Sequence, residues 1–319
     1  MASPTVHKLF VMSHPIGFIL LVNPFNPLEQ SERLIRTLNR MFDHPPIACH
    51  HDFGKNPRFI ENCPANVQLV RPHVDTKWGD FSCVEATIKA LRLLYSGKDD
   101  PQWFVYLSGS DYPIKPAGKI LADLQTGGFD GYVEHKLVSE GDLVYPPDPD
   151  NLQGWKWETW LHQCHKRYCS LRVDVPGINR YLRFSKRTFW LEHPIFTKGR
   201  LPFTSEFKCY AGEVWFCANH RCARRIIDFY DHDRRVGDHY RKTLVPEESY
   251  LQTVLANTPG LKLSQTYLRY IDWTTRKSNP KVLTLDDLPA LKRSGAHFAR
   301  KFDDRVEAAI LDELDDLTA

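Results

Sequence analysis

The sequence predicts an α/β fold with a mixed, mainly parallel central sheet that is flanked by helices. Three observations predict it: short apolar runs of strand length, segments with apolar residues at helical spacing, and the alternation of the two through the first 125 residues. Such alternation is typical of parallel sheets, because a crossover helix usually connects neighbouring parallel strands. We expect residues 1–319 to form one domain, with a first part at 1–130 and a second part at 131–319.

The first part of the chain is expected to hold four strands and two helices. The strands are short apolar runs at Gly17–Val22, Pro46–His51, Val67–Val70 and Trp103–Leu107. The helices lie between them, where apolar residues recur at helical spacing, at Leu28–Phe42 and Phe81–Tyr95. The carboxyl ends of the four strands should therefore meet at one edge of the sheet.

The second part of the chain is less regular. From about residue 135 to 205 the pattern dissolves, and we expect a long irregular excursion that is functional rather than disordered, because it is rich in aromatic residues. Regular structure should return with a strand at Glu213–Ala218. Helices are expected at Arg221–Tyr230 and Pro246–Asn257, and an acidic helical tail at Phe298–Leu317.

Composition excludes several classes of partner. The formal net charge is only +3, with Lys and Arg interspersed among acidic residues, so no nucleic-acid partner is expected. No run approaches the roughly 20 apolar residues of a membrane span, and we see no signal peptide. We therefore expect a cytoplasmic protein whose eight cysteines are reduced.

Two aspartates follow predicted strands at the edge where ligands bind in open α/β sheets. Asp52 ends the second strand, and Asp111 follows the fourth. A carboxylate at such a place can accept hydrogen bonds from a uracil or a ribose. Each can equally be an aspartate that forms a turn or caps a helix, and the sequence alone leaves both interpretations open.

A divalent metal is not expected at this edge. A metal-dependent transferase would usually carry Asp-x-Asp after such a strand, whereas this chain has Ser-Gly-Ser-Asp at 108–111. One carboxylate cannot easily hold an ion that must also bind diphosphate oxygens. Asp-x-Asp occurs at 148–150 and 231–233, in a Pro-rich loop and at a helix end, where we expect solvated surface. We expect no metal and no other cofactor.

Without a metal, a leaving diphosphate needs cationic side chains. Lys281 and the pair Arg300 and Lys301 are flanked by apolar residues and are candidates, although their spacing alone favours ordinary surface charge. Glu248 stands at the start of a predicted helix and could deprotonate an attacking hydroxyl. Local sequence alone favours a simpler role for Glu248, the stabilisation of its helix N-terminus.

Six segments, in order and spread over nearly the whole chain, resemble one family. They are WGDFS at 78–82, FVYLSGSDYPIK at 104–115, AGEVWF at 211–216, PEESYLQTVL at 246–255, IDW at 271–273 and FARKFD at 298–303. Together they resemble the branching β-1,6-N-acetylglucosaminyltransferases and peptide O-xylosyltransferases of glycosyltransferase family 14, the Core-2/I-branching type.

The resemblance implies a GT-A-type, Rossmann-like fold and a metal-independent, inverting transfer of GlcNAc or xylose from a UDP-sugar to a glycan or peptide hydroxyl. It implies that residues 1–130 bind the nucleotide and 131–319 bind the acceptor and carry out catalysis. Glu248 would be the catalytic base. The donor would be bound by Asp52, Trp78, Asp111, Lys281, Arg300 and Lys301, and the acceptor by Glu213, Trp215 and Trp273. The family arginine expected near Lys281 has no obvious match.

We expect the chain to differ from the animal members of that family, without their N-terminal membrane anchor and with a cysteine pattern that does not match their disulfides. It resembles a bacterial, cytoplasmic version. The alternative is a catalytically inactive sugar-binding or scaffold domain of the same fold. A dinucleotide-dependent oxidoreductase is disfavoured, because VNPFNP follows the first strand where Gly-x-Gly-x-x-Gly would be required.

Overall fold

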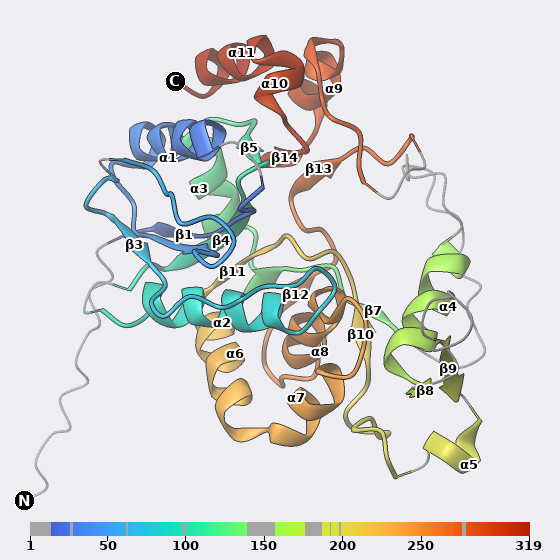
Figure 1. Ribbon diagram of the computed structural model, residues 1–319. Helices are drawn as coiled ribbons and strands as arrows, with labels where there is room; N and C mark the ends of the chain where they lie inside the picture. Colours follow the sequence, from blue (N-terminus) through green and yellow to red (C-terminus); the bar gives the residue numbers. More distant parts are fainter. Residues whose placement is uncertain are drawn as a thin grey trace, which may run out of the picture.

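A seven-stranded sheet forms the centre of the protein, in the order β12-β6-β11-β4-β1-β2-β3 (Figure 1). The computed structural model describes residues 14–25, 28–61, 63–97, 100–138, 157–175, 187–191, 193–197, 199–275 and 279–319. The strands are β1 (Ile16–Val22), β2 (Ile47–His51), β3 (Val67–Leu69), β4 (Trp103–Ser108), β6 (Gly131–Tyr132), β11 (Cys217–Asn219) and β12 (Leu263–Ser264). Strand β11 alone runs antiparallel to its neighbours. The predicted α/β fold with a mixed, mainly parallel sheet is confirmed.

Helices cover both faces of the sheet (Figure 1). On one face lie α1 (Leu28–Phe42), α3 (Ala117–Thr126) and α11 (Ala309–Thr318); on the other lie α2 (Ser82–Leu94), α6 (His220–His232) and α8 (Tyr250–Ala256). Each face carries its own apolar cluster, because side chains alternate along β1 and β4. Both strands are buried almost throughout, which explains their continuous apolar sequences.

Smaller elements surround the sheet. Three short sheets are formed by β13 (Arg269–Ile271), β14 (Phe298–Arg300) and β5 (Tyr112–Pro113), by β10 (Tyr210–Ala211) and β7 (Lys136–Leu137), and by β8 (Leu171–Val175) and β9 (Arg187–Leu191). The remaining helices are α4 (Trp157–Tyr168), α5 (Pro194–Thr197), α7 (Arg234–Tyr240), α9 (Leu288–Arg293), α10 (Asp304–Glu307) and the 3₁₀ turns η2 (Pro246–Glu248) and η3 (Leu285–Asp287).

The structure corrects several expectations for the second part of the chain. The excursion at 135–205 is not irregular where it is described, since it holds β7, α4, β8, β9 and α5. The expected helical tail is also wrong at its start, because Phe298–Arg300 forms β14, which pairs with β13 and β5. Helices α10 and α11 together then supply most of the tail as predicted.

Two further elements differ from the prediction, because backbone groups within them form hydrogen bonds outside the expected strand or helix. The strand expected at Glu213–Ala218 begins only at Cys217, since the Gly212 N–H donates to the Glu248 carbonyl (2.9 Å) and the Glu213 N–H donates to a carboxylate of Glu134 (3.0 Å). The helix expected at Pro246–Asn257 is divided into η2 and α8, because Ser249 between them leaves the helical conformation and donates its hydroxyl to the Tyr210 carbonyl (2.6 Å).

Gly212 lies where two chain segments approach too closely for a side chain, and this predicts an effect on stability. A Cβ at this position would overlap the carbonyl group of Glu134. We expect Gly212→Ala to lower the free energy of unfolding by about 1–3 kcal/mol, the usual cost of forcing an extra methyl into a packed site, as measured by urea denaturation. Gly118→Ala is the control, because no atom lies within 4 Å of its Cβ in α3. An unchanged midpoint for Gly212→Ala would contradict the close approach.

Candidate active site

Glu248 stands in a turn that is hydrogen-bonded to the Gly79 loop and to helix α4. Val245, just before η2, has a left-handed backbone (φ 55°) and donates its N–H to the Gly79 carbonyl (2.9 Å). The Val245 carbonyl accepts a hydrogen bond from the Tyr168 hydroxyl of α4 (2.7 Å). The WGDFS motif, the PEESYLQTVL motif and α4 therefore meet around this turn.

Helix α4 brings Arg167 onto the Glu248 carboxylate. The distance from Arg167 Nη1 to Glu248 Oε2 is 3.1 Å, and the two side chains remain 25% and 28% exposed. Burial raises the pKa of Glu248, while the charge and hydrogen bond of Arg167 lower it. The carboxylate is thus held in one orientation and can still be reached from solvent, which suits a group that accepts a proton. Sequence reasoning missed Arg167, which lies 81 positions away.

Glu247, the neighbour of Glu248, is a second carboxylate with unusual surroundings. Its Oε2 is buried, with no hydrogen-bond partner among the described residues. Burial, with the charge of Glu248 adding to it, raises the pKa of Glu247 to about 7. A group with such a pKa is also suited to take up a proton at neutral pH. The sequence offered no sign of this, because both residues stand at the same helix start.

Glu213 lies with Glu134 beside the same turn. The Glu134 carboxylate is bound by the Glu213 N–H and by Lys136, whose Nζ is 3.2 Å from Oε1. Burial raises the pKa of Glu213 to about 8, and the charges of Glu134 and Glu248 add to this effect. The charge of Arg300 and a hydrogen bond from Trp273 oppose it. The structure therefore brings the predicted residues Glu213, Trp273 and Arg300 into one neighbourhood with Glu248.

Arg300 and Trp215 form the next layer of the site. The Arg300 guanidinium lies 4.3 Å from the centre of the Trp215 ring, and that ring packs edge-on against Tyr106 at 4.9 Å. Arg300 Nε is 3.9 Å from a carboxylate oxygen of Asp111, which has no exposed surface. Asp111 thus faces arginine and backbone rather than solvent, so it can influence a ligand only through its neighbours in this arrangement.

The other two predicted cations, Lys301 and Lys281, differ in whether they already form an ion pair within the protein. Lys301 is partly exposed, and its side chain has no hydrogen bond or ion pair among the residues that the structure describes. Lys281 instead forms an ion pair with Asp287 (2.6 Å), the residue that closes the capping box of η3. The ammonium of Lys301 is therefore available to a ligand, whereas that of Lys281 already has a carboxylate.

Asp52 and Trp78 occupy the loops at the carboxyl end of the sheet. Asp52 is buried, and its carboxylate accepts hydrogen bonds from the Thr76 N–H (2.9 Å) and hydroxyl (3.1 Å) and pairs with Lys55 (3.0 Å). Trp78 is 90% exposed. Asp52 therefore organises its own loop, and contact of either residue with a donor stays a prediction.

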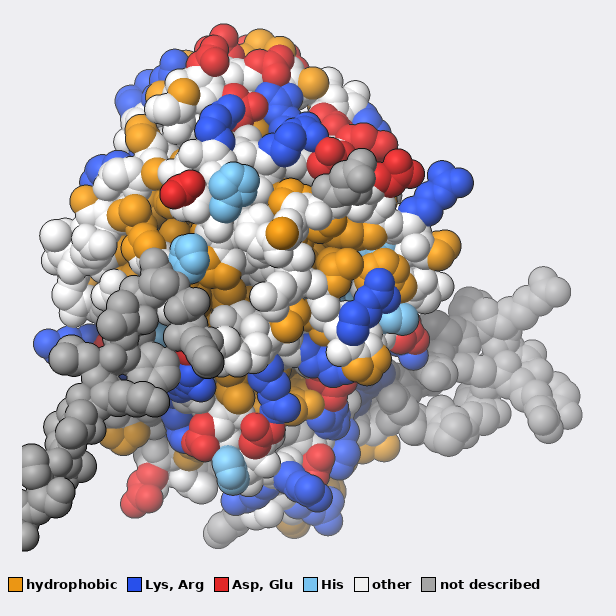
Figure 2. Space-filling model, turned by 90° about the vertical axis from the view of Figure 1, so that its left-hand side faces the viewer, with side chains coloured by type: hydrophobic (Ala, Val, Ile, Leu, Met, Phe, Trp, Pro, Cys, Tyr) orange, Lys and Arg blue, Asp and Glu red, His pale blue; other side chains and the backbone are white. Residues whose placement is uncertain are grey.

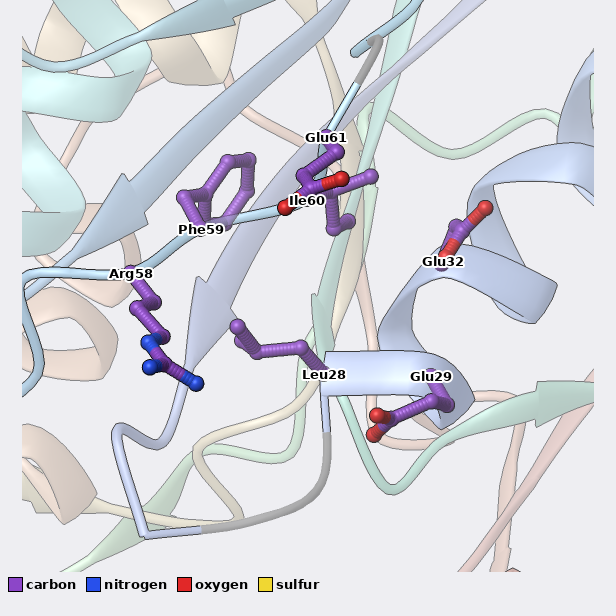
Figure 3. A pocket seen from close by; sticks show the side chains of 7 residues that line it. All are labelled: Leu28, Glu29, Glu32, Arg58, Phe59, Ile60 and Glu61. Atoms are coloured by element: carbon purple, nitrogen blue, oxygen red, sulfur yellow. The ribbon is translucent and has the colours of Figure 1, made fainter.

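A cavity of about 640 Å³ lies at the start of α1 (Figure 3). Arg58 and Phe59 face Leu28 and Glu29 across it. Its lining is completed by Glu32, Ile60 and Glu61, and none of the seven residues is among the predicted site residues. The predicted site is defined by converging side chains rather than by this cavity.

Charge on the molecular surface is mixed. Figure 2 shows basic and acidic side chains interspersed over one face rather than gathered by sign. In the described ranges, no group of three or more His, Cys, Asp or Glu residues is placed to hold a metal ion. Of the helices that are described, none combines the length and the apolar character that crossing a bilayer requires.

The environment of Asp52 predicts a pH-dependent loss of stability. Burial would raise the pKa of Asp52, but the hydrogen bonds from Lys55 and Thr76 lower it to about 2. A carboxylate whose pKa is lower in the folded state stabilises the fold above its unfolded pKa, near 3.9, and this contribution is lost as the pH falls toward 2. We expect Asp52→Asn to lower the free energy of unfolding at pH 7 by about 2 kcal/mol.

This difference should shrink between pH 4 and pH 2 in urea denaturation series. The control is Asp75→Asn. Asp75 lies 3.6 Å from the same lysine, but its side chain is 71% exposed, so its loss should cost little stability. Equal effects of the two substitutions at pH 7 would rule out the assigned network.

Known proteins resemble this chain over most of its length. Beta-glucuronosyltransferase GlcAT14A of Arabidopsis thaliana is 29% identical over 270 residues, which cover 83% of this chain and 53% of that protein. Xylosyltransferase oxt of Drosophila pseudoobscura pseudoobscura is 21% identical over 334 residues, 94% of this chain and 33% of its own. A beta-1,3-galactosyl-O-glycosyl-glycoprotein beta-1,6-N-acetylglucosaminyltransferase of Bovine herpesvirus 4 is 21% identical over 200 residues, 56% of this chain and 45% of its own.

The chain spans about half the length of the first of these relatives. The model of the Core-2/I-Branching enzyme family matches residues 25–128 and 162–291, well over half of the chain. The two matched ranges include the Gly79 loop, Arg167 and the Glu248 turn, which the structure brings together. The chain therefore belongs to the Core-2/I-branching enzyme family.

Proposed function

We propose that the protein is an inverting, metal-independent glycosyltransferase that moves a sugar from a UDP-sugar to a hydroxyl of a glycan or peptide. The observation that supports this proposal is that a carboxylate, Glu248, and a cation, Arg300, lie in one neighbourhood around Glu213. The partly exposed Glu248 carboxylate can accept a proton. Arg300, which acts with Glu248 on the pKa of Glu213, can stabilise negative charge in the same neighbourhood, and we expect Lys301, the next residue in the chain, to assist it. The pKa of Glu213 responds to the charges of both Glu248 and Arg300, so all three side chains share one neighbourhood.

The proposed reaction is a single displacement. The acceptor hydroxyl oxygen bonds to the anomeric carbon of the donor while Glu248 takes its proton. The bond from that carbon to the diphosphate oxygen breaks on the opposite face, and its electron pair leaves with the diphosphate. Arg300 and Lys301 stabilise the charge that develops there, as cationic groups placed in advance do in a partly buried site. Inversion at the anomeric carbon follows from attack opposite the leaving group.

Three donors are supported by different observations. The sequence motifs suggested UDP-GlcNAc or UDP-xylose, and relatives are named as N-acetylglucosaminyl-, xylosyl- and glucuronosyltransferases. UDP-glucuronic acid therefore joins the donors to be tested. A thermal-shift panel of the three separates them, because a ligand in hundredfold excess over its Kd stabilises the folded state by about 2.7 kcal/mol.

A sugar-binding or scaffold protein of the same family is the second candidate. Its supporting observation is that the carboxylate of Glu248 is already paired with Arg167, an arrangement that also serves a purely structural role. Release of UDP from a donor in the presence of an acceptor distinguishes the two candidates, since a binding protein would release none.

Transfer should not depend on a divalent metal. The described residues offer a single carboxylate after β4, Asp111, and it is buried between arginines rather than open to an ion. We expect donor turnover to persist in EDTA with at most a twofold change in kcat. Loss of activity in EDTA and its recovery with Mn²⁺ would overturn the role assigned to the two cations.

Substitution of Glu248 should remove catalysis and spare donor binding. A general base typically contributes 10²–10⁴-fold, so Glu248→Gln is expected to lower kcat at least about a hundredfold. Donor affinity should stay within about threefold, or ~0.7 kcal/mol, because the base faces the acceptor. Steady-state kinetics and calorimetry with the same donor measure both quantities.

Glu247→Gln is the matched comparison, since the two glutamates are adjacent and only Glu248 is paired with Arg167. We expect this variant to keep kcat within about threefold of the unmodified protein. A dead Glu247→Gln beside an active Glu248→Gln would transfer the role of base to Glu247. Normal turnover by both variants would exclude a base in this turn.

A further inference from the structure

A buried cluster of three charged side chains lies behind the cationic side of the site. Arg269 Nε is 3.4 Å from Asp111 Oδ1, and Arg300 Nε is 3.9 Å from Asp111 Oδ2. Arg269 also donates from Nη2 to the Tyr106 carbonyl (2.9 Å) and lies over the Phe298 ring at 5.0 Å. The Asp111 carboxylate accepts further hydrogen bonds from the N–H (2.8 Å) and the hydroxyl of Ser108 (2.5 Å).

This cluster carries more positive than negative charge. Two guanidinium groups share the one carboxylate of Asp111, and the side chains of Arg269 and Asp111 are almost completely buried. Among the buried polar atoms that lack a hydrogen-bond partner in the described part of the chain are Asp111 Oδ1, Arg269 Nε and Nη1, and Arg300 Nε. Neither Nε therefore hydrogen-bonds to Asp111, and Arg269 is the nearer of its two ion-pair partners.

The two arginines differ in their access to a ligand. Arg269 is enclosed between β4, β13 and β14, with 1% of its side chain exposed, whereas Arg300 keeps 17% exposed. Arg300 also lies against Trp215, whose ring limits where the guanidinium can move. Of the two arginines, Arg300 is the one that can reach a bound anion, so Arg269 acts on a ligand through its neighbours, among which Asp111 carries the opposite charge.

We propose that Arg269 is a positioning residue that occupies the Asp111 carboxylate and so leaves Arg300 free to bind the diphosphate of the donor. This inference rests on the proposed function. Without Arg269, the buried charge of Asp111 would be balanced by Arg300 alone. The attraction between opposite charges increases steeply in a buried site, so Arg300 would move onto Asp111 and away from the ligand.

The test is a comparison of UDP and uridine binding, because only UDP offers a diphosphate to Arg300. By calorimetry, we expect Arg269→Gln to weaken UDP binding at least tenfold and uridine binding less than threefold. Adding Asp111→Asn removes the competing charge while keeping an acceptor for Ser108. The double variant should therefore bind UDP at least threefold more tightly than Arg269→Gln alone.

Arg224→Gln is the matched control. Arg224 pairs with another buried aspartate, Asp100, and neither residue belongs to the site. Its loss should leave the ratio of the two affinities unchanged, whatever it does to stability.

Equal weakening of UDP and uridine by Arg269→Gln would overturn the inference, as would a double variant that binds UDP no better than the single one. If Arg269→Gln does not fold, the double variant decides alone, because it buries no unpaired carboxylate. The inference is then overturned if the ratio of its UDP affinity to its uridine affinity falls below one tenth of that of the unmodified protein. An unmodified protein that shows no preference for UDP over uridine would instead refute the proposed function.

Discussion

The site depends on one close approach of the backbone, at Gly212. There the chain passes between Glu134 and Glu248 with no room for a side chain, and its N–H donates to the Glu248 carbonyl. The next N–H, that of Glu213, donates to the Glu134 carboxylate. Three segments that are far apart in sequence are thereby held at fixed separations. Together with the bonds of Val245 to Gly79 and Tyr168, this contact fixes the turn that orients Glu248 toward Arg167.

Burial of several carboxylates in one place makes charge compensation the second constraint. Glu134 pairs with Lys136, and Glu248 pairs with Arg167. Glu213 has no ion pair among the described residues, and its negative charge is favoured by Arg300 and by a hydrogen bond from Trp273. An uncompensated buried charge is costly, which is why the pKa of Glu213 rises to about 8. The protonation of the site is therefore shared among neighbouring groups, and each cation affects more than its own partner.

The sequence could predict what is local. The helix Leu28–Phe42 is predicted at both ends, because its apolar spacing begins and stops sharply, and the buried runs of β1 and β4 could not be mistaken. The order of six short motifs led to the family. What the sequence could not supply is pairing over distance: nothing near Arg167 or Arg269 in the chain points to Glu248 or Asp111. The strand at Phe298–Arg300 was missed for the same reason, since three residues form a strand only where neighbours pair with them.

The exposed indole of Trp78 has a thermodynamic consequence. It stands 90% exposed beside Gly79, whose carbonyl holds the turn that carries Glu248. Water around so large an apolar ring contributes to the heat capacity of the free protein, and a ligand that covers the ring removes that contribution. Binding of a ligand that reaches from Trp78 toward Glu248 therefore has a negative heat-capacity change, and its enthalpy becomes more favourable with rising temperature.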